Sequence, residues 1–225
     1  MKKLNGKVFF VTGIDTNIGK SYVTGHLAKA YLEKGFRVVT QKLVQTGNIG
    51  FSEDIEIHRK IMGIERLPED IDGTTCPIIL SYPASPHLAA RIDHVRLNLK
   101  KIEHATDILK QKYDIILIEG AGGIMTPLIG NYTILNYIKD QKLPIFIVTS
   151  PRLGSINHTL LTLEICRRSE INIFALVYNN FNIEDNLISN DTKKYLKNYL
   201  KKFCNKSKWI EINNRENKHL TFELE

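Results

Sequence analysis

Residues 12–21 have the sequence TGIDTNIGKS and directly follow the apolar run VFFV at residues 8–11. In a loop of this kind the backbone N–H groups, with the free N–H groups of the helix that follows, point toward a bound phosphate. Lys20 supplies a positive charge for the outer phosphates, and the hydroxyl of Ser21 can ligate Mg²⁺. The spelling departs from G-x-x-x-x-G-K-[ST], because Gly13 stands one residue before the usual first glycine. The stretch predicts a variant phosphate-binding loop, with an ordinary strand-to-helix turn as the alternative.

Short apolar runs alternate with amphipathic segments along the rest of the chain. Runs rich in valine, isoleucine and phenylalanine are typical of strands buried on both faces, and here they occupy residues 7–12, 37–41, 114–118, 145–149 and 173–178. Between them apolar residues recur at helical spacing: Val23, Leu27, Ala30 and Tyr31 in one segment, Leu99, Ile102, Ala105 and Leu109 in a second, and Ile156, Leu160 and Leu163 in a third. Gly35 stands where a C-terminal helix cap is expected.

This alternation predicts an α/β fold: a doubly wound, mostly parallel sheet with helices on both faces, of the P-loop NTPase type. In such a sheet ligands bind beyond the carboxyl ends of the strands. With 225 residues and no Pro/Gly/Ser-rich linker, the chain is expected to form a single domain over residues 1–225. No apolar stretch approaches the ~18 residues of a membrane span. The apolar run near the N-terminus is interrupted at Gly13, which argues against a signal peptide.

The formal net charge of +7 is compatible with a nucleic-acid partner. The lysines are spread along the chain, however, and their densest cluster lies beside Leu196, Leu200 and Phe203 in a pattern typical of a solvated helix face: Lys193, Lys194, Lys197, Lys201 and Lys202. A positive field also suits anionic small-molecule ligands. We therefore expect neither a nucleic-acid partner nor a membrane partner.

The cysteines and histidines predict no metal site of their own. The three cysteines are scattered and odd in number, so neither a disulfide framework nor a C-x-x-C site is indicated. We expect reduced, structural thiols in a cytoplasmic protein. The seven histidines lack H-E-x-x-H or comparable spacing, and surface or packing positions are expected for them.

Two carboxylates are candidates for binding Mg²⁺ beside Ser21. Glu119 directly follows the strand predicted at residues 114–118, where a charged group is costly unless it holds a metal or a partner. In a P-loop protein an acidic residue on a neighbouring strand commonly completes the Mg²⁺ shell. Asp54 follows the second predicted strand. The alternatives are a helix-cap acceptor for Glu119, an N-terminal helix cap for Asp54, and a surface position for Lys42 at the end of the second strand.

Taken together, five motifs in order resemble those of the dethiobiotin synthetase family. They are GIDTNIGKS at residues 13–21, KLVQTG at 42–47, PASPH at 83–87, EGAGG at 119–123 and LGSINH at 153–158. The resemblance extends from about residue 7 to residue 180. Residues 181–225 match poorly: the family's proline-containing adenine loop is not evident there, and Glu211-Ile212-Asn213 is the candidate for its place.

The resemblance implies an ATP-dependent ring closure in which 7,8-diaminononanoate, CO₂ and ATP give dethiobiotin, ADP and phosphate. One amine of the substrate takes up CO₂ as a carbamate, ATP phosphorylates the carbamate, and the second amine displaces phosphate to close the cyclic urea. Every intermediate is anionic, so catalysis can rest on positioning and on cations that face the developing charge. The resemblance also implies a Mg²⁺ cofactor and a homodimer.

Carried over motif by motif, the resemblance assigns a role to each candidate residue. The catalytic residues are Lys42 beside the carbamate and the γ-phosphate, Lys20 beside the β- and γ-phosphates, and Thr16 in the same place. The metal ligands are Ser21, Asp54 and Glu119. The substrate contacts are Thr46 and, near the substrate carboxylate, Gly154, Ser155 and Asn157. The nucleotide contacts are Asn17, Ile18, Gly19, Lys20, Ser21, Tyr22, Asp54, Glu119, Gly120, Ala121, Gly122 and, at the base edge, Asn179.

The alternative from another functional class is a nucleotide-driven switch of the ParA/MinD kind, which shares the sheet and the variant loop. Such switches carry the signature K-G-G-x-G-K-[ST], whereas here Asp15, Thr16 and Asn17 occupy the positions of the signature lysine and its two glycines. Amide-forming enzymes of the cobyrinate amidase type are a closer alternative, but they add a glutaminase domain for which 225 residues leave no room. We therefore expect the ligase.

Overall fold

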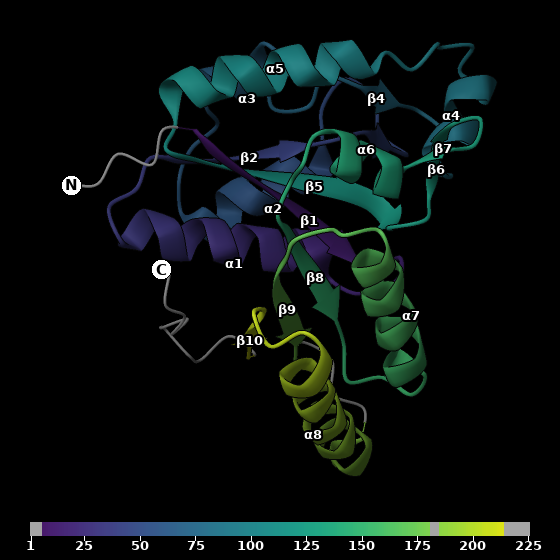
Figure 1. The fold of residues 1–225 in the computed structure, drawn as a ribbon. Coiled ribbons are helices and arrows are strands. Elements are labelled where there is room, and N and C mark those ends of the chain that lie inside the picture. The colour runs from purple at the N-terminus through teal and green to yellow at the C-terminus, as the bar shows by residue number, and fades with distance from the viewer. Residues whose placement is uncertain (1–5, 181–184, 214–225) are drawn as a thin grey trace.

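The centre of the molecule is a parallel β-sheet, seen in a computed structural model that describes residues 6–180 and 185–213 (Figure 1). The sheet has six strands in the order β10-β9-β8-β1-β5-β2, and every neighbouring pair is parallel. The strands are β1 (Lys7–Gly13), β2 (Val38–Lys42), β5 (Ile115–Gly123), β8 (Ile145–Thr149), β9 (Ile173–Asn179) and β10 (Lys208–Ile212). Because the strand order reverses at β1, a ligand crevice is expected at the carboxyl end of that strand.

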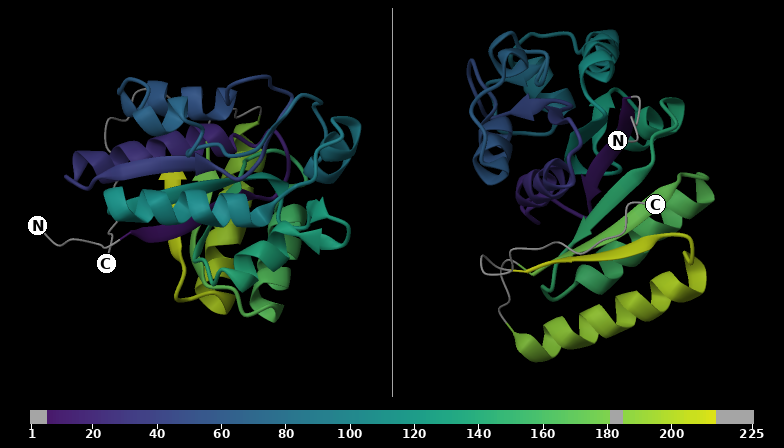
Figure 2. Two further views of the ribbon diagram at one scale, coloured as in Figure 1. Left: turned by 90° about the horizontal axis from the view of Figure 1, so that it is seen from above. Right: turned by 90° about the vertical axis from the view of Figure 1, so that its left-hand side faces the viewer.

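Helices cover both faces of the sheet. The longer ones are α1 (Lys20–Glu33), α2 (Glu53–Met62), α5 (Leu99–Lys112), α6 (Ile134–Asp140), α7 (Ser155–Arg168) and α8 (Asn186–Phe203). Figures 1 and 2 show α1 and α5 on opposite sides of the strands at one end of the sheet, and α7 and α8 side by side along the strands at the other end. The short elements between them are β3 (Gln45–Thr46), α3 (Pro68–Ile71), β4 (Ile79–Leu80), α4 (Pro86–Ile92), β6 (Pro127–Ile129) and β7 (Tyr132–Thr133).

The predicted fold class is confirmed, and each of the five predicted strands begins within one residue of an observed strand. One strand of the sheet was missed, β10 at its edge. In β10, Ile210 and Ile212 are buried, whereas Trp209 and Glu211 are only half-buried. An edge strand of this kind alternates apolar with polar residues and lacks the continuous apolar run by which a central parallel strand is identified.

Aromatic packing around β1 holds the middle of the sheet together. The ring of Phe9 lies 5.3 Å from that of Phe146 in β8 and 4.9 Å from that of Phe174 in β9, between centroids. Tyr31 of α1 stacks on the same ring of Phe9, with the ring centroids 6.3 Å apart. Pairs of this kind add about 0.5–1.5 kcal/mol each beyond the burial of their area. The packing fixes α1 against β1, and with it the ends of the loop that joins them.

The predicted helical segments form α1, α5 and α7. Gly35 follows α1 as expected, with φ +83° and a 2.9 Å hydrogen bond from its N–H to the last helical turn. The buried face of α7 differs from the prediction, since Ile156 and Leu160 are only half-buried. Ser155 and Thr159 turn inward instead and hydrogen-bond hydroxyl groups at the end of β8, at 3.0 and 2.7 Å.

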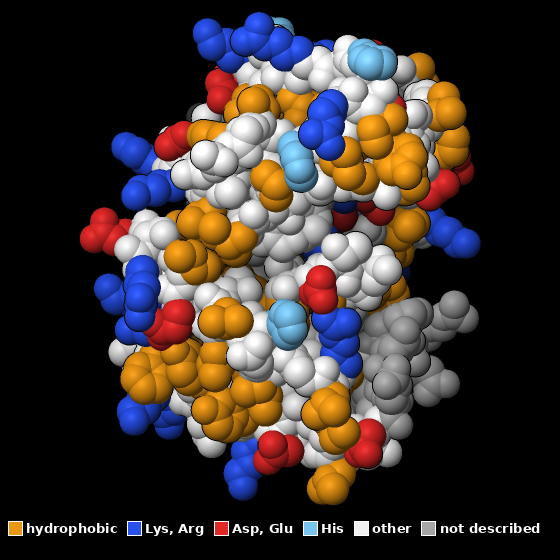
Figure 3. Space-filling view, turned by 90° about the vertical axis from the view of Figure 1, so that its right-hand side faces the viewer, with side chains coloured by type: hydrophobic (Ala, Val, Ile, Leu, Met, Phe, Trp, Pro, Cys, Tyr) orange, Lys and Arg blue, Asp and Glu red, His pale blue; other side chains and the backbone are white. Residues whose placement is uncertain are grey.

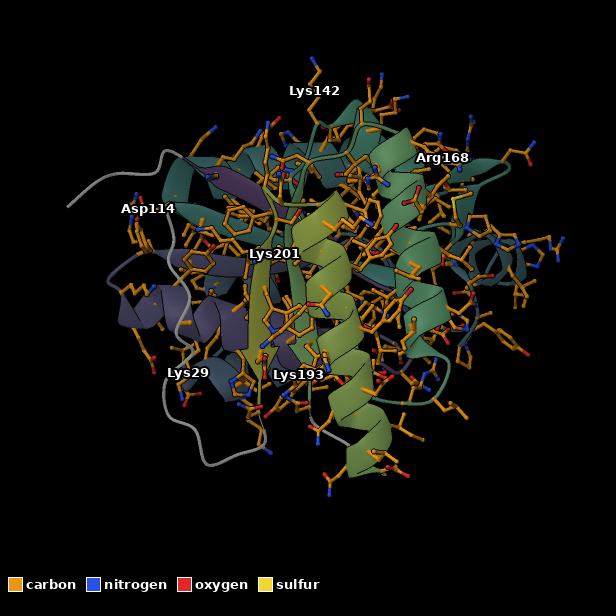
Figure 4. All side chains as sticks on the ribbon, turned by 60° about the horizontal axis from the view of Figure 1, so that its bottom comes forward. Lys29, Asp114, Lys142, Arg168, Lys193 and Lys201 are labelled. Atoms are coloured by element: carbon orange, nitrogen blue, oxygen red, sulfur yellow. The ribbon has the colours of Figure 1, made fainter. Side chains whose placement is uncertain are left out.

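The expectation of a solvated lysine face on α8 holds for four exposed positions, whereas Lys193 is half-buried; the four are Lys194, Lys197, Lys201 and Lys202. Lys193 and Lys197 form ion pairs with Glu211 of β10, at 2.8 and 2.6 Å, and so tie the helix to the edge strand. Lys193 and Lys201 are labelled on α8 in Figure 4. Phe203, expected beside the apolar face, is 42% exposed because it lies in the last turn of the helix.

Two glycines share a left-handed backbone conformation but differ in how closely other atoms approach them. Gly19 and Gly35 both have φ +83°, but a Cβ on Gly19 would lie 2.3 Å from Asn179 Nδ2, whereas no described atom lies within 4 Å of a Cβ on Gly35. Gly35→Ala is expected to cost about 1–2 kcal/mol of folding free energy, the price of left-handed backbone. Gly19→Ala should cost at least ~1 kcal/mol more, because the hydrogen bond of Asn179 is lost as well. Urea denaturation of both variants measures the difference, and equal losses would contradict the close approach at Gly19.

Candidate active site

A cavity of about 1130 Å³ opens at the carboxyl ends of the central strands. Figure 3 faces this edge of the molecule and shows a hollow with acidic and basic side chains inside it. Most of the residues predicted for the site line the cavity: Thr16, Asn17, Ile18, Gly19, Lys20, Ser21, Tyr22, Lys42, Thr46, Asp54, Glu119, Ala121, Gly122 and Asn179. Typical small-molecule sites have about 300–1,000 Å³, so there is room for a nucleotide and a second substrate.

The loop between β1 and α1 has the backbone geometry of a phosphate-binding loop. Asn17 and Gly19 have positive φ angles of 58° and 83°, the left-handed turns from which anion-binding nests of N–H groups are built. The ammonium of Lys20 folds back and donates to Asp15 O at 2.9 Å. The amide of Asn179 donates to a loop carbonyl, also at 2.9 Å, and ties the loop to the end of β9.

The early position of Gly13 has a local explanation. The side chain of Ile18 packs back over the start of the loop, so a Cβ on residue 13 would meet Ile18 Cδ1 at 2.5 Å. The next residue, Ile14, is buried, and its N–H donates to Val148 O of β8 at 3.1 Å. The first turn of the loop is therefore still part of the sheet, and the close approach that requires glycine falls on residue 13.

Four polar side chains converge at the bottom of the cavity. Lys42 Nζ lies 2.5 Å from Asp54 Oδ2 and 2.7 Å from Glu119 Oε1. Ser21 Oγ lies 2.7 Å from Asp54 Oδ1 and 3.0 Å from Glu119 Oε1. A hydroxyl carries one proton, so Ser21 donates to only one of these carboxylates at a time. The structure thus brings together the residues predicted to bind the metal and the lysine predicted to act in catalysis.

The structural alternatives considered for these residues do not describe them. The N-cap of α2 is Ser52, whose hydroxyl accepts from Ile55 N at 3.2 Å, and Asp54 lies two residues further on, in the first turn of the helix. Glu119 caps no helix, because it lies within β5 directly opposite Lys42 in the register with β2. Lys42 itself is buried.

Burial and charge act differently on the two lysines. Burial lowers the pKa of Lys42, but the carboxylates of Glu119 and Asp54 outweigh this effect and raise the pKa above its ordinary value. Burial raises the pKa of Glu119, but Lys42 and His58 together hold it far below its usual range. Burial lowers the pKa of Lys20 to about 8, although the charge of Glu119 opposes the change. Lys42 is a fixed cation between two anions, whereas Lys20 is a cation that lacks full compensation.

One residue at the site was missed by sequence reasoning. His58, for which a surface or packing position was expected, is completely buried, and its Nε2 lies 2.7 Å from Glu119 Oε2. Its Nδ1 lies 3.0 Å from Thr40 Oγ1. The periodicity of α2 places His58 on the buried face of the helix, together with Ile55 and Met62. That position, with a carboxylate expected nearby, is the signal that could have found it.

Four predicted residues do not line the cavity in the part of the chain that the structure describes. Gly120 lies behind it, where its carbonyl oxygen is 3.3 Å from Lys42 Nζ. Gly154 is the N-cap of α7, the hydroxyl of Ser155 is buried against Ser150 at 3.0 Å, and Asn157 is exposed. From this region the lining residues are Ser150, Pro151 and Arg152 instead.

The tripeptide Glu211-Ile212-Asn213, the candidate for the adenine loop, has another environment. Glu211 lies in β10, where the two lysines of α8 and the indole N–H of Trp209, at 2.8 Å, surround its carboxylate. These partners hold the pKa of Glu211 at about 2, although burial alone would raise it. Asn213 accepts a 2.6 Å hydrogen bond from Asn180, the residue after Asn179. Ile212 is the register partner of Asn179, and its carbonyl oxygen accepts from Asn180 N at 2.8 Å. Among the described residues, therefore, Ile212 and Asn213 of this tripeptide are tied to the region where the base was predicted to lie.

The oxygen atoms beside Lys42 fit a hard divalent cation. Mg²⁺ is commonly bound through one or two carboxylates together with the phosphates of a substrate, and Asp54, Glu119 and Ser21 supply such a set of oxygens. Among residues 6–180 and 185–213, no group of three or more histidine, cysteine, aspartate or glutamate side chains could hold a metal. A cation beside these three residues would therefore need further oxygen ligands from a nucleotide.

The sheet and the loop between β1 and α1 define the chain as a P-loop nucleotide-binding protein. The family model AAA_26, described as an AAA domain, matches residues 7–205. The chain is 48% identical to ATP-dependent dethiobiotin synthetase BioD 2 of Haemophilus ducreyi, over 87% of this chain and 93% of that protein. It is 44% identical to ATP-dependent dethiobiotin synthetase BioD of Chlorobaculum tepidum, over 90% of this chain and 84% of that protein. The chain belongs to the ATP-dependent dethiobiotin synthetase family, as the motifs indicated.

Solved structures with the same fold are more distant in sequence. A ParA family ATPase from Chlorobium tepidum superposes with a TM-score of 0.53 at 16% identity, over 94% of this chain and 86% of that chain. The MinC:MinD cell division protein complex of Aquifex aeolicus gives a TM-score of 0.52 at 14% identity, over 93% and 82% of the two chains. These likenesses show the fold alone. None of the described helices is both long and apolar enough to cross a membrane.

The buried charge of Lys20 predicts that this residue destabilises the ligand-free protein. Its pKa is lowered from 10.5 to about 8, so between these values the folded state binds fewer protons than the unfolded state and the free energy of unfolding rises with pH. Lys20→Met is expected to raise that free energy by about 1–3 kcal/mol at pH 7 and to remove the rise above pH 8.

Chemical denaturation without nucleotide, from pH 7 to pH 10, measures both effects. Lys60→Met is the matched control, because Lys60 is an exposed lysine of α2. A Lys20→Met variant that is less stable than the wild type at pH 7 would show that the charge of Lys20 is fully compensated.

Proposed function

We propose that this chain closes the ureido ring of dethiobiotin from 7,8-diaminononanoate and CO₂, with conversion of ATP to ADP and phosphate. The observation that carries the proposal is the position of Lys42 Nζ between Asp54 and Glu119, at 2.5 and 2.7 Å, in a cavity that the phosphate-binding loop also lines. A cation, a cation-binding pair of carboxylates and a phosphate site thus lie together. That combination suits the transfer of a phosphoryl group to an anionic acceptor.

The reaction needs positioning and charge more than a protein nucleophile. An amine of the substrate attacks CO₂ and loses a proton to give a carbamate, whose oxygen then attacks the γ-phosphorus of ATP and releases ADP. The second amine attacks the carbonyl carbon of the carbamoyl phosphate and expels phosphate, which closes the ring. Lys42 faces the carbamate and the γ-phosphate, Lys20 the β- and γ-phosphates, and Thr16 donates in the same place. Fixed cations that meet developing anionic charge account for much of the catalysis of such reactions.

Mg²⁺ is held by Ser21, Asp54 and Glu119 in this proposal, and when bound it neutralises charge on the phosphates. The same two carboxylates now bind Lys42. Lysine is a point charge on a flexible stem, so Lys42 can leave the carboxylates for a phosphate or carbamate oxygen without the backbone of β2 moving. The two carboxylates therefore keep a cation near them in both states.

The nucleotide and substrate contacts follow the predicted roles. Residues 17–22, the Gly120–Gly122 segment and Asn179 surround the nucleotide, with Asn179 at the base edge, and Thr46 contacts the diamine. Gly154, Ser155 and Asn157 lie outside this cavity at the start of α7, where the neighbouring Leu153 is 82% exposed. In a homodimer this turn can serve the partner's substrate, whose nine-carbon chain is long enough to reach a second subunit. A cytoplasmic location fits the three cysteines, which are buried free thiols.

A nucleotide switch is the alternative that the fold alone leaves open. The position of the signature lysine of such switches is occupied by Asp15, whose carboxylate forms an ion pair with Arg152 across the mouth of the loop. A carboxylate at this point does not provide the charge that the lysine signature contributes. The pairing supports the ligase.

The function is tested by measuring ADP release while the reactants are omitted in turn. With ATP and Mg²⁺, ADP should appear only when both diaminononanoate and bicarbonate are present, with one dethiobiotin per ADP by mass spectrometry. DNA or lipid should change nothing. Steady hydrolysis without diamine, stimulated by DNA or lipid and accompanied by ATP-dependent dimerisation, would identify a switch instead.

The charge of Lys42 is expected to be needed for turnover. Lys42→Gln should lower the rate of dethiobiotin formation by about 10²-fold or more, since one charge aimed at a transition-state anion contributes ~3–4 kcal/mol. ATP binding should largely persist, because Lys20 and the loop remain. Lys60→Gln, an exposed lysine of α2, is the control for loss of charge. Near-normal turnover of a folded Lys42→Gln variant would exclude Lys42 from the mechanism.

The carboxylates are expected to set the Mg²⁺ requirement. Glu119→Gln and Asp54→Asn each remove a charge from a hard-cation site without changing size, so the Mg²⁺ concentration that gives half-maximal rate should rise. Glu53→Gln is the matched control, because Glu53 is the exposed neighbour of Asp54 in the same helical turn. Unchanged Mg²⁺ titrations in both variants would make the carboxylates purely structural.

A further inference from the structure

A continuous row of buried hydrogen bonds leads from Arg59 to Glu119. Arg59 Nη1 donates to Thr40 Oγ1 at 2.8 Å, Thr40 Oγ1 lies 3.0 Å from His58 Nδ1, and His58 Nε2 lies 2.7 Å from Glu119 Oε2. All four residues are buried, with His58, Thr40 and Glu119 completely so. Burial keeps these side chains out of contact with bulk solvent, so their hydrogen bonds to one another determine where each proton lies.

The row places a proton on Nε2 of His58. The carboxylate of Glu119 can only accept, so His58 Nε2 carries a proton and donates to Oε2. A guanidinium can only donate, so Thr40 Oγ1 accepts from Arg59. The hydroxyl proton of Thr40 is then available to His58 Nδ1. Every bond in the row is donated in the same direction, from a cation toward an anion, and such bonds strengthen one another.

We propose that His58 is a positioning residue for Glu119: its Nε2–H holds Oε2 and thereby directs Oε1 into the cavity. Oε1 is the oxygen that lies 2.7 Å from Lys42 Nζ and 3.0 Å from Ser21 Oγ. As regards Mg²⁺ binding this rests on the proposed function, in which Glu119 is a metal ligand. His58 touches neither nucleotide nor substrate in this proposal.

The far end of the row is fixed independently of the cavity. Arg59 forms two parallel hydrogen bonds with Asp70, both at 2.8 Å. Asp70 in turn accepts from Leu67 N and from Thr75 Oγ1, each at 2.7 Å. This pair connects α2 to the segment that contains α3. The row that orients Glu119 is therefore anchored in two packed elements outside the site.

Hydrogen-bond partners of metal ligands influence the metal strongly. Removal of such a partner typically costs 10–100-fold in metal affinity, because the ligand loses its orientation. Without the Nε2–H, Glu119 Oε2 would be an unpaired buried anion, and the carboxylate could turn away from Ser21. Loss of His58 should therefore weaken Mg²⁺-dependent binding of ATP and leave Mg²⁺-independent binding unchanged.

Nitrogen NMR of the ¹⁵N-histidine-labelled protein tests the tautomer without catalysis. His58, assigned by the signal that disappears in His58→Gln, should carry a proton on Nε2. Thr40→Val, which removes the hydroxyl and keeps the shape, should leave the proton on Nε2, because the carboxylate of Glu119 can only accept a hydrogen bond. An Nε2 without a proton in the wild type would overturn the proposal.

Calorimetric titration of ATP, with Mg²⁺ and with EDTA, tests the positioning role. In His58→Leu the gain in ATP affinity that Mg²⁺ provides should fall about tenfold or more, with no change in EDTA. His58→Gln, whose amide can donate to Glu119, should retain most of the gain. Equal weakening of ATP binding in Mg²⁺ and in EDTA, or an unchanged gain in His58→Leu, would show that His58 only fills space.

The two proposals fail in different ways. If the wild type forms no dethiobiotin, the proposed function fails. The NMR measurement on His58 does not depend on that result. If the wild type forms dethiobiotin and His58→Leu responds to Mg²⁺ like the wild type, only the role of His58 is refuted.

Discussion

The structure depends on two carboxylates that share one lysine at the carboxyl edge of the sheet. Lys42 and Glu119 are direct partners in the register of β2 and β5, and Asp54 reaches the same ammonium from the first turn of α2. A buried charge without a partner is far more costly than a buried pair. The register of two strands and the placement of a helix are therefore coupled to the charges of the site.

The same arrangement explains how charged side chains can be buried in the cavity and still be available for a reaction. The charge of Lys42 is committed to Asp54 and Glu119, whereas Lys20 donates to the backbone carbonyl of Asp15. In the proposed function, a nucleotide supplies an anion for Lys20. In the proposed function, a divalent cation also replaces Lys42 at the carboxylates, so that this lysine becomes available to the reacting groups. Both lysines thus lie in the cavity, close to where the proposed function places the phosphates.

The sequence predicts the parts of this structure that local patterns encode. The central strands are continuous apolar runs, and Ser21, Lys42 and Glu119 stand where strands or the loop end, so their convergence follows from the parallel sheet. Asp54 was also predicted, although its partner is known only from the fold. The roles of these residues in binding and catalysis remain predictions.

What escaped prediction depends on contacts between distant segments. His58 meets Glu119 across 61 positions of sequence, so this pairing is known only from the fold. Ser155 was expected near the substrate but turns inward toward Ser150, because the packing of α7 on β8 decides which face is buried. Edge strand β10 alternates polar and apolar residues and was not predicted. Lys193 was therefore assigned to solvent, because its partner Glu211 lies in that strand.

The most direct test of this account is the titration of the two cavity lysines, followed by NMR of ¹⁵N-labelled side-chain ammonium groups in the ligand-free protein. The account predicts that Lys20 loses its proton near pH 8. Lys42 should keep its proton at pH values above 10.5, the ordinary pKa of a lysine. In Glu119→Gln the pKa of Lys42 should fall, because one of its two carboxylate partners is gone. A wild-type Lys42 that titrates at or below the pH at which Lys20 titrates would contradict the account.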